Sequence, residues 1–186
     1  MELELSPDKI AALAQRIDRP ILLVGMMGVG KTSVGRRLAQ TLNLPFTDAD
    51  DEIVHAAQMS IAEMFERYGE AYFRDGERRV IARLVDSGRG VIATGGGSFV
   101  HPETRAMILS KGIAVWLDSD LEALLERVGR NSNRPLLRGG NPAEILARLK
   151  AERESAYAEA PIHVKSSQGP HGRTVQKVLR ELDAWL

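Results

Sequence analysis

The chain has 186 residues, with 25 basic and 25 acidic side chains, no cysteine and 44% hydrophobic residues. This length and balance predict a single domain over residues 1–186 and argue against a nucleic-acid binder, a membrane-surface binder or a disulfide-stapled fold. No apolar stretch approaches the roughly 20 residues of a membrane helix, and no secretory signal is recognisable. We therefore expect a cytoplasmic protein, and a monomer.

The first segment, residues 1–19, reads as a polar N-terminal extension. Within it a helix is expected from about Pro7 to Ile17. A polar helix ahead of the first strand is expected to be solvated or only loosely docked.

Beyond the extension, short apolar runs alternate with segments of helical length. The expected strands are 21–24, 44–46, 90–94, 113–117 and 162–165. Helix starts are indicated by the capping boxes Ser60 with Glu63 and Ser119 with Glu122, and by Asn141 before Pro142. Helix ends are indicated by Gly69, Gly88 and Gly112. Because parallel strands need crossover helices, this alternation predicts a parallel sheet covered on both faces, with ligands beyond the carboxyl ends of its strands.

A phosphate-binding loop follows the first strand. The sequence Gly25-Met26-Met27-Gly28-Val29-Gly30-Lys31-Thr32 fits the pattern G-x-x-x-x-G-K-[ST], and a helical run over 33–43 follows it. Glycines let successive backbone N–H groups converge on phosphate oxygens, and the helix N-terminus adds partial positive charge. Lys31 can reach the β- and γ-phosphates, and Thr32 can offer its hydroxyl to Mg²⁺.

Other motifs narrow the class of nucleotide-binding protein. A small GTPase needs Asp-x-x-Gly and Asn-Lys-x-Asp, and neither occurs in this chain. Motor and remodelling ATPases normally need a larger domain. A small phosphotransferase remains.

Four acids crowd the end of the second expected strand, at Asp48, Asp50, Asp51 and Glu52. In a strand, Asp48 and Asp50 would point to the same side, because side chains alternate with period 2. Two such carboxylates suit a magnesium water shell and an acceptor hydroxyl. Asp51 and Glu52 are instead expected to complement a helix N-terminus.

Two later segments are also rich in candidate ligand groups. Gly95, Gly96 and Gly97 would let a substrate lie against bare backbone. The stretch 127–140 holds four arginines without an acid and predicts a mobile lid, about 129–141, that closes on the triphosphate. Arg130 and Arg138 of that stretch are expected on the solvated surface.

Taken in order, these motifs resemble the shikimate kinase family of P-loop kinases. The resemblance rests on the loop 25–32, Asp48-x-Asp50, Phe73-Arg74-x-x-Glu77, the three glycines 95–97, the segment Asn133-Arg134-Pro135-Leu136-Leu137, and Arg153 four residues before Tyr157. It implies a three-layer α/β/α fold with a five-stranded parallel sheet, a lid, and a substrate-binding excursion over about 50–78. It also implies transfer of the ATP γ-phosphate to the 3-hydroxyl of shikimate, in the pathway to aromatic amino acids.

The same resemblance implies the roles of individual residues. The catalytic group would be Asp50, Lys31 and Arg134. The ATP-binding group would be Gly28, Val29, Gly30, Lys31, Thr32, Ser33, Arg127 and Arg134, with Arg127 near adenine. The substrate group would be Asp50, Arg74, Gly95, Gly96, Gly97 and Arg153, in which Arg74 and Arg153 grip the substrate carboxylate. Mg²⁺ would be held by Thr32 and, through water, by Asp48.

Two alternatives remain open at this level. One is a gluconate-type carbohydrate kinase, which shares the loop and lid but has less use for paired arginines beside Asp-x-Asp. The other is a catalytically silent nucleotide-binding scaffold, which the joint presence of Lys31, Thr32, Asp50 and Arg134 argues against. Residues 166–172, where adenine contacts would fall, match no family pattern cleanly.

Overall fold

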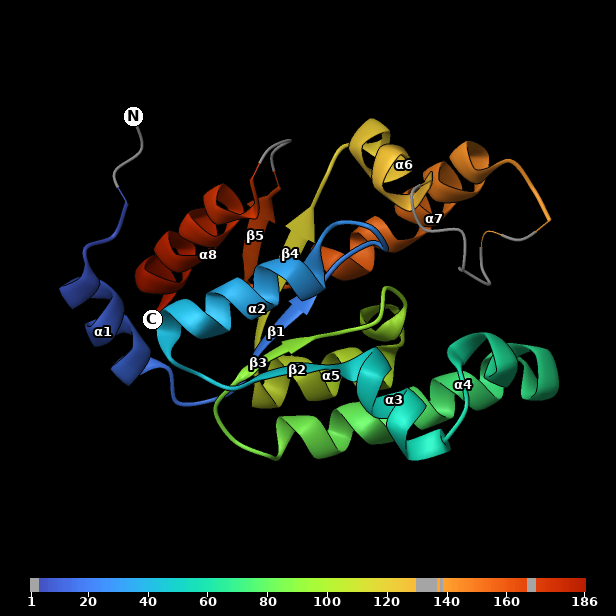
Figure 1. Cartoon of the computed structure of the whole chain (residues 1–186), viewed down its shortest axis with the longest axis horizontal. Coiled ribbons are helices and arrows are strands. Elements are labelled where there is room, and N and C mark those ends of the chain that lie inside the picture. Colours follow the sequence, from blue (N-terminus) through green and yellow to red (C-terminus); the bar gives the residue numbers. More distant parts are fainter. Residues whose placement is uncertain (1–3, 130–136, 138, 167–169) are drawn as a thin grey trace.

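The fold is built on a five-stranded parallel sheet (Figure 1). The computed structural model describes residues 4–129, 137, 139–166 and 170–186. The strands are β1 (Ile21–Val24), β2 (Phe46–Asp48), β3 (Val91–Ala93), β4 (Ile113–Asp118) and β5 (Ile162–Lys165). Their order is β2-β3-β1-β4-β5, and every pair is parallel. The predicted α/β class and five-stranded parallel sheet are therefore confirmed.

Strand β1 lies at the centre of the sheet, which explains its uninterrupted apolar sequence. It pairs with β3 on one side and with β4 on the other, and all four of its residues are buried. A strand covered on both faces has no polar face, so it reads as a continuous apolar run. Edge strand β5 instead alternates buried and exposed residues.

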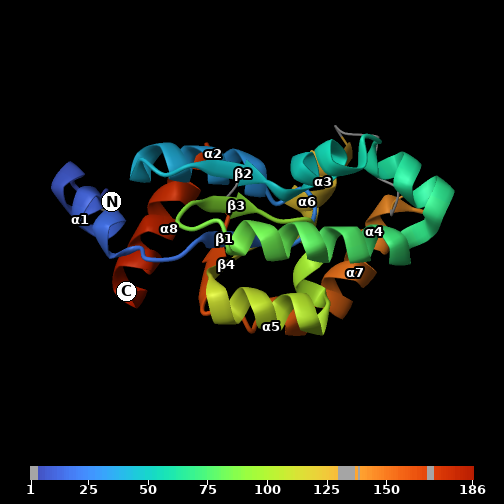
Figure 2. The same cartoon turned by 90° about the horizontal axis from the view of Figure 1, so that it is seen from below.

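The described residues form eight α-helices and one 3-10 turn. They are α1 (Pro7–Arg16), α2 (Lys31–Leu42), α3 (Ala49–Ala57), α4 (Ile61–Val85), η1 (Ser98–Val100), α5 (Pro102–Lys111), α6 (Leu121–Gly129), α7 (Pro142–Tyr157) and α8 (His171–Trp185). Helix α2 lies over one face of the sheet and α5 over the other (Figure 2). The pairs α3–α4 and α6–α7 lie toward the carboxyl ends of the strands (Figure 1). No helix in this part of the chain is both long enough and apolar enough to cross a membrane.

Local signals placed several helix ends correctly. The Ser60 hydroxyl accepts a hydrogen bond from the Glu63 amide, and the Glu63 carboxylate accepts one from the Ser60 amide. These two bonds confirm the capping box of α4. Asn141 caps α7 with Pro142 in its first turn, and Gly112 ends α5. Gly69 adopts a left-handed φ of 80° but interrupts α4 instead of ending it.

Other expected boundaries were wrong. The second strand is 46–48, not 44–46, and the helix after the glycine-rich loop begins at Lys31 rather than at residue 33. The buried Ser119 hydroxyl has no hydrogen-bond partner among the described residues, so it does not form the predicted capping box. Helix α6 begins at Leu121, and its first backbone bond runs to the carbonyl of Asp120.

The N-terminal helix is docked more firmly than expected. Leu13 and Ile17 are fully buried, and Arg16 forms an ion pair of 2.7 Å with Asp183 of α8. Arg89, which precedes β3, donates to the carbonyl of Ala14. The expectation of a solvated or loosely docked helix is therefore wrong, because two apolar side chains of this polar segment complete the core between α2 and α8.

This docking predicts a stability cost for truncating Leu13. Leu13→Ala is expected to lower the free energy of unfolding by about 2–5 kcal/mol, because it leaves a cavity in the core. Gln15→Ala, at an exposed position of the same helix, should change it by less than about 0.5 kcal/mol. Urea unfolding of both variants makes the comparison, and equal effects would mean that α1 is not part of the cooperative core.

Candidate active site

The glycine-rich loop joins β1 to α2 in a conformation suited to anions. Gly30 caps α2 with a left-handed φ of 100°, and no side chain caps this helix. The first turn of α2 also carries no acidic residue. The helix therefore supplies no acid of its own to neutralise its N-terminal N–H groups and partial positive charge, which favours a bound anion such as phosphate.

Lys31 lies folded into this loop. It is only 9% exposed, and its Nζ donates to the carbonyl oxygens of Gly25 (2.7 Å) and Met26 (2.9 Å). The loop therefore brings together backbone amides, a helix N-terminus and one ammonium group. Gly28 and Val29 belong to the same loop, and Ser33 is exposed in the first turn of α2.

Asp48 links the loop to the neighbouring helix. Its Oδ2 accepts a hydrogen bond of 2.6 Å from Thr32 Oγ1, and its Oδ1 accepts the amide of Asp50 at 3.0 Å as the N-cap of α3. Asp50 therefore lies in the first turn of α3, not in the strand. The period-2 argument for Asp48 and Asp50 is wrong, although both carboxylates do lie at the same end of the sheet.

Thr32 and Asp48 present two oxygen ligands side by side. Among the described residues, no three or more His, Cys, Asp or Glu side chains gather into a metal cage. Mg²⁺ does not require one, because it usually takes one or two protein oxygens and completes its shell with water and phosphate. The contact between Thr32 and Asp48 fits a magnesium ion held beside a triphosphate.

A second group of charges lies where α4 passes η1. Glu77 is 1% exposed, and its carboxylate accepts hydrogen bonds from Arg74 Nη1 (2.7 Å) and Ser98 Oγ (2.6 Å). Glu70 also pairs with Arg74 at 3.3 Å. A buried carboxylate needs such partners, and the bond to Glu77 holds the Arg74 guanidinium in one orientation.

The three glycines after β3 let these groups come close together. A Cβ atom on Gly95 would collide with Glu77 and lie 3.2 Å from Asp50 Oδ1. A Cβ atom on Gly97 would collide with the Arg74 guanidinium. The glycines therefore allow α3, α4 and the backbone after β3 to meet at one point.

Arg153 of α7 completes this cluster. The residue is 7% exposed, and its Nη1 is buried without a hydrogen-bond partner in the described structure. This Nη1 lies 3.7 Å from the position of a Cβ on Gly96. Tyr157, one turn later, donates to the Gly96 carbonyl, and burial raises the pKa of its phenol. Taken in isolation, Arg153 would be interpreted as an exposed surface charge, and that interpretation is wrong.

The unpartnered Nη1 indicates what this end of the sheet can bind. Leaving a buried charged donor unsatisfied costs more than about 1–3 kcal/mol. An anionic group placed between Arg153 and Arg74, beside the bare backbone of Gly96, would satisfy it. A planar carboxylate suits guanidinium groups best, because both can form two parallel hydrogen bonds.

The opposite side of the glycine-rich loop carries Arg127 and His171. Arg127 Nη1 donates to the carbonyl of Val29 at 3.2 Å. The His171 ring, at the start of α8, approaches to 3.2 Å from the position of a Cβ on Gly30. Burial, followed by the charges of Arg127 and Arg37, lowers the pKa of His171. This places an uncharged aromatic ring and a guanidinium beside the expected phosphate position.

Some expected residues lie outside the described part of the chain. These are Arg134, the surface candidates Arg130 and Arg138, and Asn133, Pro135 and Leu136 of the motif that carried the resemblance. Most of the expected lid, 129–141, falls there too. The roles assigned to Arg134 and to the lid stay predictions.

Sequence reasoning missed the roles of Glu77, Ser98, Tyr157 and His171. Glu77 stands three residues after Arg74, a helical spacing that could have indicated their ion pair. The contacts of Ser98, Tyr157 and His171 join segments far apart in the chain, and no local sequence pattern indicates these contacts.

The chain matches one known protein family over most of its length. A family model described as shikimate kinase matches residues 27–183. A curated shikimate kinase of Novosphingobium aromaticivorans is 61% identical over 186 residues, covering 98% of this chain and 96% of that protein. One from Caulobacter vibrioides is 55% identical over 164 residues, covering 88% and 82%.

Solved structures agree with these matches. The shikimate kinase from Acinetobacter baumannii in complex with shikimate has a TM-score of 0.86 and 36% identity, covering 94% of this chain and 96% of that one. A gluconokinase from Sinorhizobium meliloti reaches a TM-score of 0.62 at 18% identity, covering 90% and 93%. At that identity the gluconokinase shares the fold alone.

The lowered pKa of His171 predicts a pH dependence of stability. Below the ordinary value of 6.5, the unfolded chain takes up this proton before the folded protein does. The free energy of unfolding should therefore fall as the pH drops from 6.5 toward the folded-state pKa, and this component should be fully present above 6.5. Urea unfolding of wild type and His171→Gln at about pH 7.5 and pH 5.5 tests this. Wild type should lose more stability than the variant on acidification, and parallel losses would contradict the prediction.

Proposed function

The chain belongs to the shikimate kinase family, and on that premise we propose that its glycine-rich loop holds ATP while Asp50, Arg74 and Arg153 hold shikimate. The activity of this family is ATP-dependent phosphorylation of shikimate, an alcohol acceptor, on the route to aromatic amino acids. We assign the 3-hydroxyl as the acceptor group. The observation that carries the assignment of the acceptor side is the buried Nη1 of Arg153, which has no hydrogen-bond partner among the described residues.

On the nucleotide side, the backbone of Gly28, Val29 and Gly30 surrounds the β- and γ-phosphates. Lys31 leaves the carbonyls of Gly25 and Met26 and moves its ammonium group onto phosphate oxygens when the nucleotide binds. In this exchange Lys31 gives up its hydrogen bonds to two neutral carbonyl oxygens and gains charged acceptors. The remaining ATP-binding group is Thr32, Ser33, Arg127 and Arg134.

On the acceptor side, Arg74 and Arg153 grip the shikimate carboxylate from α4 and α7. Glu77 keeps the Arg74 guanidinium oriented before substrate arrives, so less entropy is lost on binding. The backbone at Gly95, Gly96 and Gly97 lies against the ring of shikimate.

Asp50 faces the acceptor hydroxyl from the first turn of α3. Its Oδ1 lies 3.2 Å from the position of a Cβ on Gly95. Asp50 can orient the hydroxyl toward the γ-phosphorus and accept its proton as the new P–O bond forms and the bond from the γ-phosphorus to the bridging oxygen of ADP breaks. Phosphoryl transfer depends mainly on such alignment and on charge stabilisation, in which Arg134 would share.

We further propose that Mg²⁺ accompanies ATP, held by the hydroxyl of Thr32 and, through water, by Asp48. When bound, the ion would neutralise charge on the β- and γ-phosphates. The contact of 2.6 Å between Thr32 and Asp48 supports this pairing of donors. A monomeric state and a cytoplasmic location are part of the same proposal.

The function is tested by measuring ADP release with shikimate, gluconate and nucleoside monophosphates in parallel. Shikimate should be turned over fastest, because its ring holds the carboxylate and the acceptor hydroxyl at a fixed separation. Gluconate carries both groups on an open chain, and nucleoside monophosphates have no carboxylate. Turnover of either alternative at a higher kcat/KM would overturn the assignment. Release of ADP without any acceptor serves as the background.

The carboxylate grip is tested with Arg153→Lys, matched by Arg148→Lys at an exposed position of the same helix. Lysine keeps the charge but loses the planar pair of donors, so KM for shikimate should rise about tenfold or more. KM for ATP and the free energy of unfolding should change little, and Arg148→Lys should behave as wild type. Equal losses for both substrates would assign Arg153 a structural role instead.

A further inference from the structure

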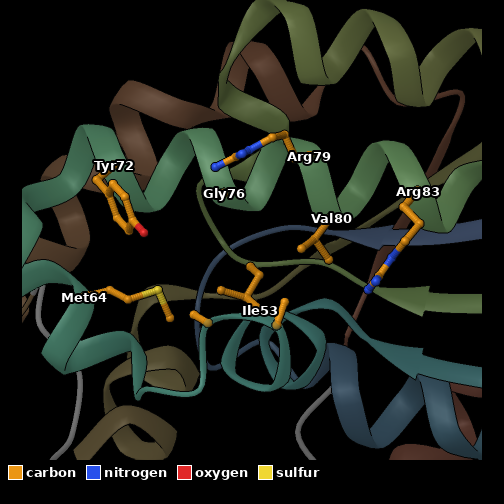
Figure 3. A pocket seen from close by; sticks show the side chains of 9 residues that line it. Ile53, Met64, Tyr72, Gly76, Arg79, Val80 and Arg83 are labelled. Carbon is orange, nitrogen blue, oxygen red and sulfur yellow. The ribbon is translucent and has the colours of Figure 1, made fainter.

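An additional cavity lies between α3 and α4, separate from the candidate active site. Its volume is about 340 Å³, within the range of small-molecule pockets. Ile53 rises from α3 toward Val80 of α4, and Met64 lies at one end (Figure 3). These three side chains are nearly fully buried in the core, so the floor of the cavity is rigid and apolar.

Gly76 keeps the α4 wall of this cavity open. A Cβ atom at position 76 would meet no atom within 4 Å, so close packing does not require glycine here. In a helix interior glycine costs about 1 kcal/mol relative to alanine. The chain therefore carries a locally unfavourable residue where its effect is to leave space beside an apolar floor.

Two arginines, Arg79 and Arg83, lie at the rim of the cavity. Arg83 pairs with Glu52 at 2.7 Å, and Arg79 pairs with Asp75 at 3.1 Å. Each pair engages a single nitrogen of a group that has five N–H donors. Asp75 is also shared with Arg78, whose Nε lies 3.9 Å from Glu103 as well, so Arg79 shares its carboxylate partner and keeps N–H donors for a further anion.

An aromatic ring stands at the mouth of the cavity. Tyr72 points from α4 toward Met64 (Figure 3) and is 47% exposed. Its ring lies 4.6 Å from that of Tyr68, which is also exposed. An exposed tyrosine beside an open apolar floor offers a stacking surface for a planar ligand.

From this combination we propose that the α3–α4 cavity binds a small aromatic carboxylate. The ring lies on Ile53 and Val80 with an edge against Tyr72, and the carboxylate reaches Arg79 and Arg83. The site is distinct from the shikimate site, because Arg74 and Glu77 leave α4 on the face that meets Gly95 and Gly97, whereas Gly76 and Val80 line the cavity.

The test uses 1-naphthoate as the probe, titrated into the full chain by calorimetry. Saturating shikimate and ADP are present, so that the probe cannot report on the catalytic arginines. Gly76→Leu fills the cavity and should raise Kd about tenfold or more, whereas Gly76→Ala should retain most of the binding. The double variant Arg79→Gln/Arg83→Gln should also weaken binding about tenfold, and Arg67→Gln, elsewhere on α4, should not.

Three outcomes would overturn the proposal. They are an absence of binding to wild type below about 10 mM, equal affinity of wild type for neutral 1-naphthamide, and unchanged affinity in the double arginine variant. Thermal unfolding of each variant establishes that it is folded. If Gly76→Leu does not fold, the arginine pair and the naphthamide comparison still decide the question.

Discussion

The burial of charge beyond the carboxyl ends of the strands is the constraint on which this active site depends. Lys31, Glu77 and Arg153 are all at most 9% exposed, and each must find a partner there or remain costly. Glu77 meets this demand with Arg74 and Ser98, and Lys31 meets it with carbonyls of its own loop. Arg153 meets it only in part, because its Nη1 has no partner in the described structure. The paired charges of Glu77 and Lys31 preorganise the site. The Nη1 of Arg153, which has no partner in the described structure, is available to bind a ligand.

Glycine makes this arrangement sterically possible. At Gly95 and Gly97 a Cβ atom would collide with Glu77 and Arg74 respectively, so the backbone after β3 can approach α4 only without side chains. Gly76 is different, because nothing lies near it. The first two glycines allow close contact, whereas the third leaves a space. One helix, α4, therefore presents a tightly paired charged face to the active site and an open apolar face to the cavity beside α3.

Much of the fold was predictable because its signals are local. The apolar run 21–24 indicated the central strand, and the Ser60–Glu63 box indicated the start of α4. Errors arose where tertiary contacts decide. Ser119 has the capping pattern but is buried beside β4, and Leu13 lies in a polar segment yet completes the core. In the site, the geometric reason given for Asp50 was wrong, since it lies in α3 and not in a strand.

By itself the sequence determined the parallel α/β class and the phosphate loop, because strand pattern and glycine spacing are written in contiguous residues. The roles of the candidate site residues stay predictions. Only the tertiary structure decided that Asp48 bridges Thr32 and α3, and that Arg153 is buried with one nitrogen unpartnered. It also decided that α4 carries two different faces. These features depend on contacts between residues that are distant in the chain. A local sequence pattern does not indicate which side chains will find hydrogen-bond partners through such contacts.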